Sequence, residues 1–380
     1  MVWSTAPAGL LPQSAGAASL CRRTPYVLSP SRMKAIIFHG PRDVRVESAP
    51  DPSLTSADGA IVRVTRSSIC GSDLHPYHGV LPMLPGVVIG HEGVGIVEDV
   101  GRDVRRFKKG DRVIIAGVVG CGDCASCRST YVVGCTNPQN ANKVFGFTHE
   151  LPGAQAEAIQ VPQADTNLFA TPASLSDEQV LFLTDILPTG YYAAENAAIK
   201  PGQTIAVVGC GPVGLFAIMS AQLFGPAKIL AIDKVAYRLD MARQLGAVPI
   251  DAGAVDPRTA VFEATGGQGA HAVIEAVGAG ETVQLALDLV RIGGVVSVVG
   301  VLLQPDFPFP MGTAFMKDLT FRIGLVNVPR FVPQLLPLVE SGVLDPTRLI
   351  SHRLPLSEGR RAYEMFDGRL DGCFKVALIP

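Results

Sequence analysis

Hydrophobic positions divide the chain into two regions with different spacing. From residue 33 to about 167, short runs rich in Val and Ile, such as KAIIFHG and DRVIIAGVV, are broken by Gly, Pro and Asp. Such runs predict a β-rich domain with irregular loops. From about residue 185, strand-like runs alternate with segments of helix length, and the strands are expected at 204–208, 228–233, 272–276 and 294–299. This alternation predicts a parallel sheet covered by helices on both faces.

The end of the chain predicts a return to the first domain. A helix is expected near residues 333–342, and FKVALIP at 374–380 reads as a closing strand. The chain has 380 residues, and single cores stop growing near 250 to 300 residues. We therefore expect an α/β protein with two domains, one formed by 33–184 together with 324–380 and the other by 185–323.

Residues 1–32 differ from the rest of the chain. They hold three Arg and no Asp or Glu, and they are rich in Ala, Ser and Pro. This composition is typical of an organelle transit peptide. Alternatively, translation starts at Met33, the preceding segment is an over-long gene prediction or a disordered tail, and the protein is cytoplasmic. Under either interpretation the segment lies outside the predicted fold.

Charge and hydropathy narrow the class of partner. The formal net charge is -2, and no run of five Lys or Arg occurs. The sequence therefore lacks the cluster of basic residues that binding to nucleic acid or anionic lipid requires. Residues 201–227 carry no charge and are long enough for a membrane helix. However, the glycines and proline of GCGPVG at 209–214 predict that they divide into a strand, a turn and a helix. We therefore expect no membrane span and a small-molecule partner.

A glycine motif predicts a dinucleotide site. Gly209, Gly211 and Gly214 form G-x-G-x-x-G with Pro212 and Val213 inside it, directly after a predicted strand. The glycines allow a tight turn, close approach of the pyrophosphate, and close packing of helix on strand.

The next predicted strand supports this interpretation. It ends in Asp233, nineteen residues after Gly214. A carboxylate at this position accepts hydrogen bonds from a ribose and repels a 2′-phosphate, which favours NAD over NADP. The alternative is a surface Asp at a strand end, and Lys234 and Arg238 are close enough to weaken the preference for NAD.

Four cysteines have the spacing of a metal site. Cys121, Cys124, Cys127 and Cys135 form C-x2-C-x2-C-x7-C. Disulfides need an oxidising compartment, and an iron–sulfur run of this type continues with x3 and Cys-Pro. Four thiolates suit a closed, structural zinc site. Such a site holds a loop and leaves no position for a substrate, so the catalytic residues are expected elsewhere.

Two further stretches complete a resemblance to a known family. They are SSICGSDLHPYHG, with Cys70, and PGVVIGHEGVG, with His91. Followed along the chain by the cysteine loop and then by the glycine motif, they make residues 33–380 resemble the zinc-dependent medium-chain alcohol dehydrogenases. The resemblance implies a GroES-like catalytic domain and a Rossmann domain. It also implies that Cys70 and His91 bind a catalytic zinc.

The third zinc ligand departs from the commonest pattern of that family. Where many members have Cys, this chain offers Asp185, as do members that resemble glutathione-independent formaldehyde dehydrogenases. A Cys, His and Asp set with an open fourth position suits catalytic zinc. By the same resemblance Glu92 is a carboxylate behind the ligands, or a ligand that replaces one of them.

The resemblance also implies a reaction. Zinc lowers the pKa of an alcohol, Ser72 takes its proton, and His75 passes the proton to solvent, while hydride goes to NAD. Thr189 is expected beside the nicotinamide, the backbone at Val299 on its carboxamide, and Lys375 near the pyrophosphate. The partner is then a small alcohol or aldehyde, and relatives are homodimers or homotetramers. Two alternatives are a polyol or amino-alcohol dehydrogenase, and a zinc and nucleotide-binding relative without turnover.

Overall fold

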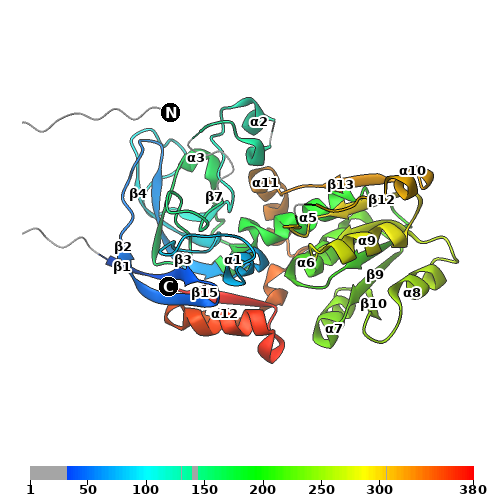
Figure 1. The fold of residues 1–380 in the computed structure, drawn as a ribbon. Coiled ribbons are helices and arrows are strands. Elements are labelled where there is room, and N and C mark those ends of the chain that lie inside the picture. Colours follow the sequence, from blue (N-terminus) through cyan, green and yellow to red (C-terminus); the bar gives the residue numbers. More distant parts are fainter. Residues whose placement is uncertain (1–31, 130, 139–143, 305) are drawn as a thin grey trace, which may run out of the picture. The chain divides into compact units, whose positions relative to one another are not determined.

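The computed structural model describes residues 32–129, 131–138, 144–304 and 306–380 (Figure 1). Residues 1–31 of the predicted leader therefore lie outside the described residues, and its last residue, Arg32, begins the first strand instead. The first part of the chain contains β1 (Arg32–Gly40), β2 (Asp43–Pro50), β3 (Ala60–Ser68), α1 (Leu74–Tyr77), β4 (Glu92–Val100), β5 (Arg112–Ile115), α2 (Ala125–Arg128), β6 (Ala158–Val161), α3 (Ala164–Asn167), β7 (Leu168–Ala170) and α4 (Asp177–Leu181).

These strands form two antiparallel groups. β1 pairs with β2. The larger sheet contains β3, β4, β5 and β7 in this order, and β6 pairs with the first residues of β3, from Ala60 to Arg63. The short strands follow from Val and Ile runs interrupted by Gly and Pro. The predicted β-rich half is thus confirmed.

The second part of the chain is a parallel sheet between helices. It contains α5 (Ile186–Asn196), β8 (Thr204–Val208), α6 (Pro212–Ala221), β9 (Lys228–Asp233), α7 (Ala236–Gln244), β10 (Val248–Asp251), α8 (Pro257–Ala264), β11 (Ala270–Glu275), α9 (Gly280–Leu289), β12 (Val290–Val298), α10 (Met311–Met316) and β13 (Thr320–Ile323). The strand order is β10-β9-β8-β11-β12-β13, and each pair is parallel.

Alternate residues of β8 show why both faces of this sheet are covered. Ile205 and Val207 pack in one buried cluster with residues of α6 and α7, whereas Ala206 and Val208 pack in another with residues of α8 and α9. A strand buried on both faces is apolar throughout, as the sequence of β8 is. The predicted doubly wound sheet, and with it the α/β fold class, is confirmed.

The largest differences from the predicted boundaries are in β12 and in the helix near residue 333. β12 begins at Val290, four residues before the expected start, because the strand continues through Gly293, which has φ +69, and Gly294. The helix expected at 333–342 is α11 (Val328–Glu340), and it keeps Pro333 and Pro337 in its interior. Its buried residues recur with helical spacing, so packing of that face outweighs the cost of the prolines.

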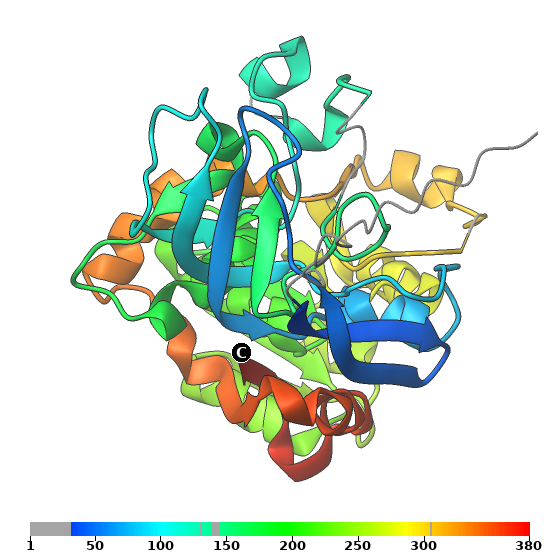
Figure 2. The ribbon, with the colours of Figure 1, turned by 90° about the vertical axis from the view of Figure 1, so that its left-hand side faces the viewer.

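The last segment returns to the first sheet. It contains β14 (Ile350–Pro355), α12 (Gly359–Gly368) and β15 (Lys375–Ile379). β15 pairs antiparallel with β3, where Ala377 lies opposite Ser68. Figure 2 shows this segment (red) alongside the strands from the start of the chain (blue). Among the described residues, no helix is both long and apolar enough to cross a bilayer.

Candidate active site

Three side chains that are distant in sequence converge at the end of β3. Cys70 follows this strand, His91 precedes β4, and Asp185 stands directly before α5. Asp185 Oδ2 lies 3.4 Å from Cys70 Sγ and 3.3 Å from His91 Nε2. Cys70 and His91 are buried, and the Asp185 side chain is 15% exposed. The group therefore opens to solvent on the Asp185 side only.

This donor set fits zinc. Ligand bonds of 2.0–2.3 Å in a tetrahedron separate neighbouring donor atoms by roughly 3.3–3.8 Å, which agrees with the two distances to Asp185 Oδ2. One thiol, one imidazole and one carboxylate are the ligand types of catalytic zinc sites, which keep a fourth position open. Cys70, His91 and Asp185 are thus arranged as three such ligands.

Two of these three groups, Cys70 and His91, have raised pKa values, and the third, Asp185, has a lowered one. Burial, followed by the Asp185 carboxylate, raises the pKa of the Cys70 thiol. Burial opposes the charged form of His91, but Asp73 and the other acidic groups outweigh it and raise the pKa of His91 well above its usual value. Burial also opposes ionisation of Asp185, but the hydrogen bond from His91 prevails and lowers the pKa of this carboxyl. Metal binding must displace the thiol and imidazole protons.

Asp73 is a part of the site for which no role was predicted. Its Oδ1 lies 3.1 Å from His91 Nδ1, the ring nitrogen that faces away from Asp185. Its Oδ2 accepts a 2.9 Å hydrogen bond from the backbone N–H of Cys70. A carboxylate on the far nitrogen fixes the tautomer and the orientation of a metal-binding imidazole. Its position three residues after Cys70 was the only signal in the sequence.

Glu92 and Lys375 form a fully buried ion pair behind the ligands. Lys375 Nζ lies 2.6 Å from Glu92 Oε2 and also donates to the backbone oxygen of Ile69. Both side chains are 0% exposed. Lys375 was expected near the pyrophosphate, and in this structure its ammonium is paired with the Glu92 carboxylate.

Of the two residues expected to carry protons, Ser72 contacts a ligand candidate and His75 lies on the short helix that follows. Ser72 Oγ is 3.1 Å from His91 Nε2, so the hydroxyl is beside the position that the three donors surround. His75 lies on α1 and is half-buried. Burial, and then the charge of His78, lower the pKa of His75. His75 is therefore neutral, and able to accept a proton, over a wider pH range.

The glycine loop has the geometry that close packing requires. Gly209 has φ +91, which favours glycine. A Cβ at Gly214 would lie 1.8 Å from the backbone oxygen of Gly209, so no other residue fits there. Gly211 precedes the first turn of α6, where Pro212 and Val213 are half-buried. Free N–H groups at the start of this ten-residue helix suit a phosphate.

Asp233 and Arg238 flank this loop. Asp233 Oδ2 accepts a 2.7 Å hydrogen bond from the backbone N–H of Cys210, inside the motif. A guanidinium nitrogen of Arg238 would lie 3.7 Å from a Cβ at Gly211. Arg238 Nε is buried and has no hydrogen-bond partner among the described residues. An anion or ribose hydroxyl could satisfy it, so these side chains fit a dinucleotide.

Thr189 and Val299 lie on the elements expected to surround the nicotinamide. Thr189 is on the first turns of α5, and its Oγ1 donates a 2.9 Å hydrogen bond to the backbone oxygen of Asp185. Val299 follows β12, and its N–H donates to the backbone oxygen of Glu275. Thr189 thereby connects the metal-site candidate Asp185 to α5.

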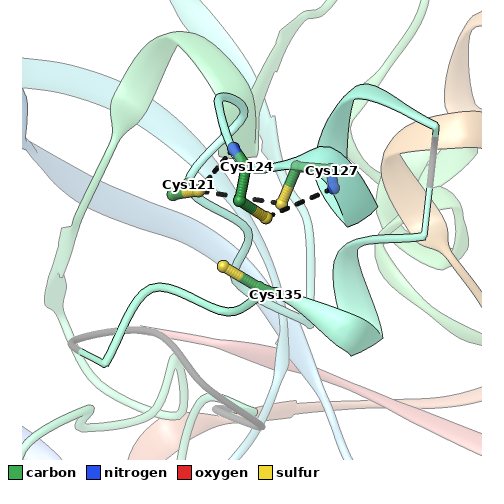
Figure 3. Close-up of side chains that lie close together, drawn as sticks. All are labelled: Cys121, Cys124, Cys127 and Cys135. Atoms are coloured by element: carbon green, nitrogen blue, oxygen red, sulfur yellow. Dashed lines mark hydrogen bonds between the residues drawn. The ribbon is translucent and has the colours of Figure 1, made fainter.

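The four cysteines converge at a second, separate site (Figure 3). Their sulfurs point toward one another, and those of Cys121 and Cys127 are 3.9 Å apart. Four thiolates bound at about 2.3 Å in a tetrahedron would be separated by roughly 3.8 Å, so the site fits zinc. The backbone N–H groups of Cys124 and Cys127 each donate to a sulfur three residues earlier, at 3.4 Å. These hydrogen bonds stabilise the thiolate form of the accepting sulfurs. At Cys135 burial disfavours the thiolate and raises the pKa of the thiol.

Asn167 attaches this loop to the first sheet. Its side-chain oxygen accepts from the backbone N–H of Gly120, and its side-chain nitrogen donates to the Gly120 oxygen, both at 2.9 Å. The amide thus pairs with Gly120 as a neighbouring strand would. The small cluster of Val118, Val132 and the buried cysteines provides little hydrophobic core, so a metal is the main candidate for ordering the loop.

The fold and these two donor sets define a class: a two-part protein with a dinucleotide fold and zinc-type metal sites. Residues 56–173 match the alcohol dehydrogenase GroES-like domain, and residues 212–341 match the zinc-binding dehydrogenase domain. A "probable zinc-binding alcohol dehydrogenase" of Mycobacterium tuberculosis is 42% identical over 348 residues, which cover 92% of this chain and 89% of the relative.

Solved structures agree with the domain matches. An alcohol dehydrogenase of Thermus sp. ATN1 is 44% identical with a TM-score of 0.86, covering 91% of this chain and 99% of that one. A zinc-dependent alcohol dehydrogenase 2 of Streptococcus pneumonia is 35% identical with a TM-score of 0.84, covering 91% and 98%. Of two further similar structures, 29% and 25% identical, the first is bound to NADP and the second to NADH.

The chain belongs to the zinc-type medium-chain alcohol dehydrogenase family. It is an oxidoreductase of the zinc-dependent alcohol dehydrogenase type, and the predicted family, the GroES-like domain and the general function are confirmed. The comparisons do not distinguish NAD from NADP or identify the third zinc ligand. Both assignments are therefore argued from the side chains of this chain.

Proposed function

We propose that this protein is an NAD-dependent alcohol dehydrogenase whose catalytic zinc is bound by Cys70, His91 and Asp185. The convergence of these three side chains carries the proposal, since Asp185 Oδ2 lies 3.3–3.4 Å from both other donor atoms. The chain resembles formaldehyde dehydrogenase-like members in offering Asp at this position. Substrates are small alcohols or aldehydes.

The site residues divide the chemistry between them. Zinc, when bound, supplies Lewis-acid polarisation of the substrate oxygen. Ser72, with its hydroxyl 3.1 Å from His91 Nε2, is close enough to accept a hydrogen bond from a substrate hydroxyl at the open position and to hold its proton. His75, whose pKa is lowered chiefly by burial, takes the proton toward solvent. Thr189 orients the nicotinamide face that receives hydride.

Asp233 supports NAD as the cofactor. Its carboxylate is held by the loop through Cys210 N–H and by the N–H groups of Lys234 and Val235. A negative charge fixed at the ribose position repels a 2′-phosphate and accepts hydrogen bonds from ribose hydroxyls. Arg238 would contact the same ribose or the pyrophosphate, and the Val299 backbone would contact the carboxamide.

Two variants test these assignments. Asp185→Ala should reduce the metal content from about two to about one zinc per chain and abolish turnover, while the affinity for NADH is retained. Asp233→Gly should weaken NAD more than NADP. Full activity of Asp185→Ala would remove Asp185 from the ligand set, and an unchanged NAD to NADP ratio would remove Asp233 from the cofactor site. A screen of primary, secondary and polyol substrates then identifies the alcohol class.

We also propose that the protein assembles as a homodimer or homotetramer through β13 and α10. β13 is an edge strand of the parallel sheet. Large apolar side chains beside it are exposed: Phe315 83%, Met316 76%, Met311 70% and Ile323 58%. An exposed apolar edge of this kind fits an identical edge on a second copy. Phe315→Asp should shift the mass measured by light scattering toward the monomer, and an unchanged assembly would locate the interface elsewhere.

A further inference from the structure

A chain of buried polar contacts, two hydrogen bonds and one ion pair, leads from α12 to His91. The Tyr363 hydroxyl donates to Gln155 Oε1 at 2.9 Å, and Gln155 Nε2 lies 3.2 Å from Asp73 Oδ2. Asp73 Oδ1 in turn lies 3.1 Å from His91 Nδ1. Tyr363 and Gln155 are 0% exposed, and Asp73 and His91 are 4% exposed. The chain therefore connects the C-terminal helix to a ligand candidate without contact with solvent.

The neighbours of Gln155 determine which way its amide points. Its side-chain nitrogen faces two acceptors, the Ser68 backbone oxygen at 3.1 Å and the Asp73 carboxylate. A carbonyl and a carboxylate can only accept, so the NH2 end must face them and the oxygen must face Tyr363. The Tyr363 hydroxyl then has to donate. Tyr363 thus donates to Gln155 and Gln155 donates to Asp73, whose carboxylate is an acceptor that faces Gln155 on one side and His91 on the other.

The backbone around Gln155 is fixed as well. Its N–H donates to Ile89 at 3.0 Å, and its carbonyl accepts from Ile36 at 2.8 Å. A Cβ at Gly90, the residue before His91, would come within 2.3 Å of Gln155 Cγ. The amide thus packs directly behind the residue that precedes the ligand, and glycine is required there.

Gln155 restricts the Asp73 carboxylate. Asp73 Oδ2 accepts from both Gln155 and the Cys70 N–H, which leaves Oδ1 directed at His91. The Asp73 carboxylate therefore orients both the backbone of Cys70 and the imidazole ring of His91. Without the Gln155 amide, the carboxylate has one donor fewer on Oδ2 and can rotate away from the imidazole.

We propose that Gln155 and Tyr363 are positioning residues for the catalytic metal site, acting on His91 and Cys70 through Asp73. The inference rests on the proposed function in so far as Cys70 and His91 are the metal ligands. Gln155 and Tyr363, which lie 82 and 290 positions after Asp73 in the sequence, would then hold the ligands in place without contacting the metal. Partners that orient metal-binding side chains change metal affinity by about 10–100-fold when they are lost.

Metal affinity of the purified holoenzyme tests the proposal. Gln155→Met removes the amide at similar volume, and we expect zinc at the catalytic site to bind about tenfold or more weakly in competition with a chelator. Tyr363→Phe removes only the hydroxyl, and we expect a loss of about fivefold, the value of one buried hydrogen bond. Tyr77→Phe is the matched control, because its ring lies 5.4 Å from that of Tyr363 and its hydroxyl is outside the chain. It should bind zinc as the wild type does.

Cobalt substitution gives a readout that a structural defect would not imitate. In both variants the visible spectrum of cobalt at the Cys, His and Asp set should change, while cobalt at the four-cysteine site and the affinity for NADH stay the same. Zinc affinity and cobalt spectra equal to the wild type in Tyr363→Phe would overturn the proposal, even if Gln155→Met does not fold. Asp185→Ala separates the two hypotheses: if it loses the metal and the Gln155 and Tyr363 variants do not, only this inference fails.

Discussion

Replacing Lys375 by Met would leave the Glu92 carboxylate without its cation. The two charges are 2.6 Å apart and fully buried, and Glu92 Oε1 has no hydrogen-bond partner among the described residues. The Met side chain has a similar length and can keep the packing against the rings of Phe182 and Phe366, which lie 5.2 and 5.9 Å from Lys375 Nζ. The main effect is therefore electrostatic.

The expected loss of stability is large. Removing one partner of a buried ion pair costs about 3–5 kcal/mol, because the remaining charge is buried without compensation. Burial already raises the pKa of Glu92, and Lys375 opposes that rise. Without Lys375 the folded-state pKa moves further above the unfolded value of 4.5.

The sign of the pH dependence follows from this shift. Below the unfolded pKa both states are protonated, and the ionisation of Glu92 costs nothing. As the pH rises above that value, the unfolded chain ionises first, so the variant loses stability by about 1.4 kcal/mol per pH unit until the folded pKa is reached. Lys375→Met should thus be close to the wild type near pH 5 and much less stable near pH 8.

Thermal and urea unfolding followed by circular dichroism, with zinc present, measures this difference. Adding Glu92→Gln to Lys375→Met should recover most of the stability at pH 8, because both buried groups are then neutral. Lys317→Met is a matched control, since Lys317 Nζ donates to backbone oxygens of Leu287, Asp288 and Val290 and its loss should be independent of pH. Equal stability of Lys375→Met and the wild type at pH 8 would refute the reasoning.

Three further changes have defined outcomes. Gly214→Ala places a Cβ 1.8 Å from the Gly209 oxygen; it should abolish NADH binding in a fluorescence titration while both zinc ions remain, and normal binding would mean that the loop can open. Cys135→Ser should lower zinc by about one per chain and expose residues 121–138 to limited proteolysis, and an uncut, fully loaded variant would contradict a metal-ordered loop. His78→Gln removes a charge that lowers the pKa of His75, so the acid limb of the pH profile of kcat should move to higher pH; an unmoved limb would show that His75 does not control it.

The strands of the parallel sheet could be predicted closely because each is a local run of apolar residues. The predicted ends of β8 and β9 agree with the structure, at Thr204–Val208 and Lys228–Asp233. β12 was placed too late, because Gly293 and Gly294 are typical of a turn and only pairing with β11 keeps them in a strand.

The site divides in the same way. Cysteine spacing and the glycine motif are local, so their residues could be named from the sequence. Asp73, Gln155 and Tyr363 meet only through the tertiary fold, and no spacing along the chain relates them. The ion pair of Lys375 with Glu92 joins residues more than 280 positions apart, so the sequence alone could not indicate it.

The return of the last strand to β3 also affects how the protein is made. Lys375, the first residue of strand β15, comes more than 280 residues after Glu92. Domains fold as they emerge from the ribosome, beginning at the amino terminus. While the parallel sheet is synthesised, β3 therefore lacks its pairing with β15, and Glu92 lacks its ion pair with Lys375. The first sheet is thus completed only after the parallel sheet has been translated.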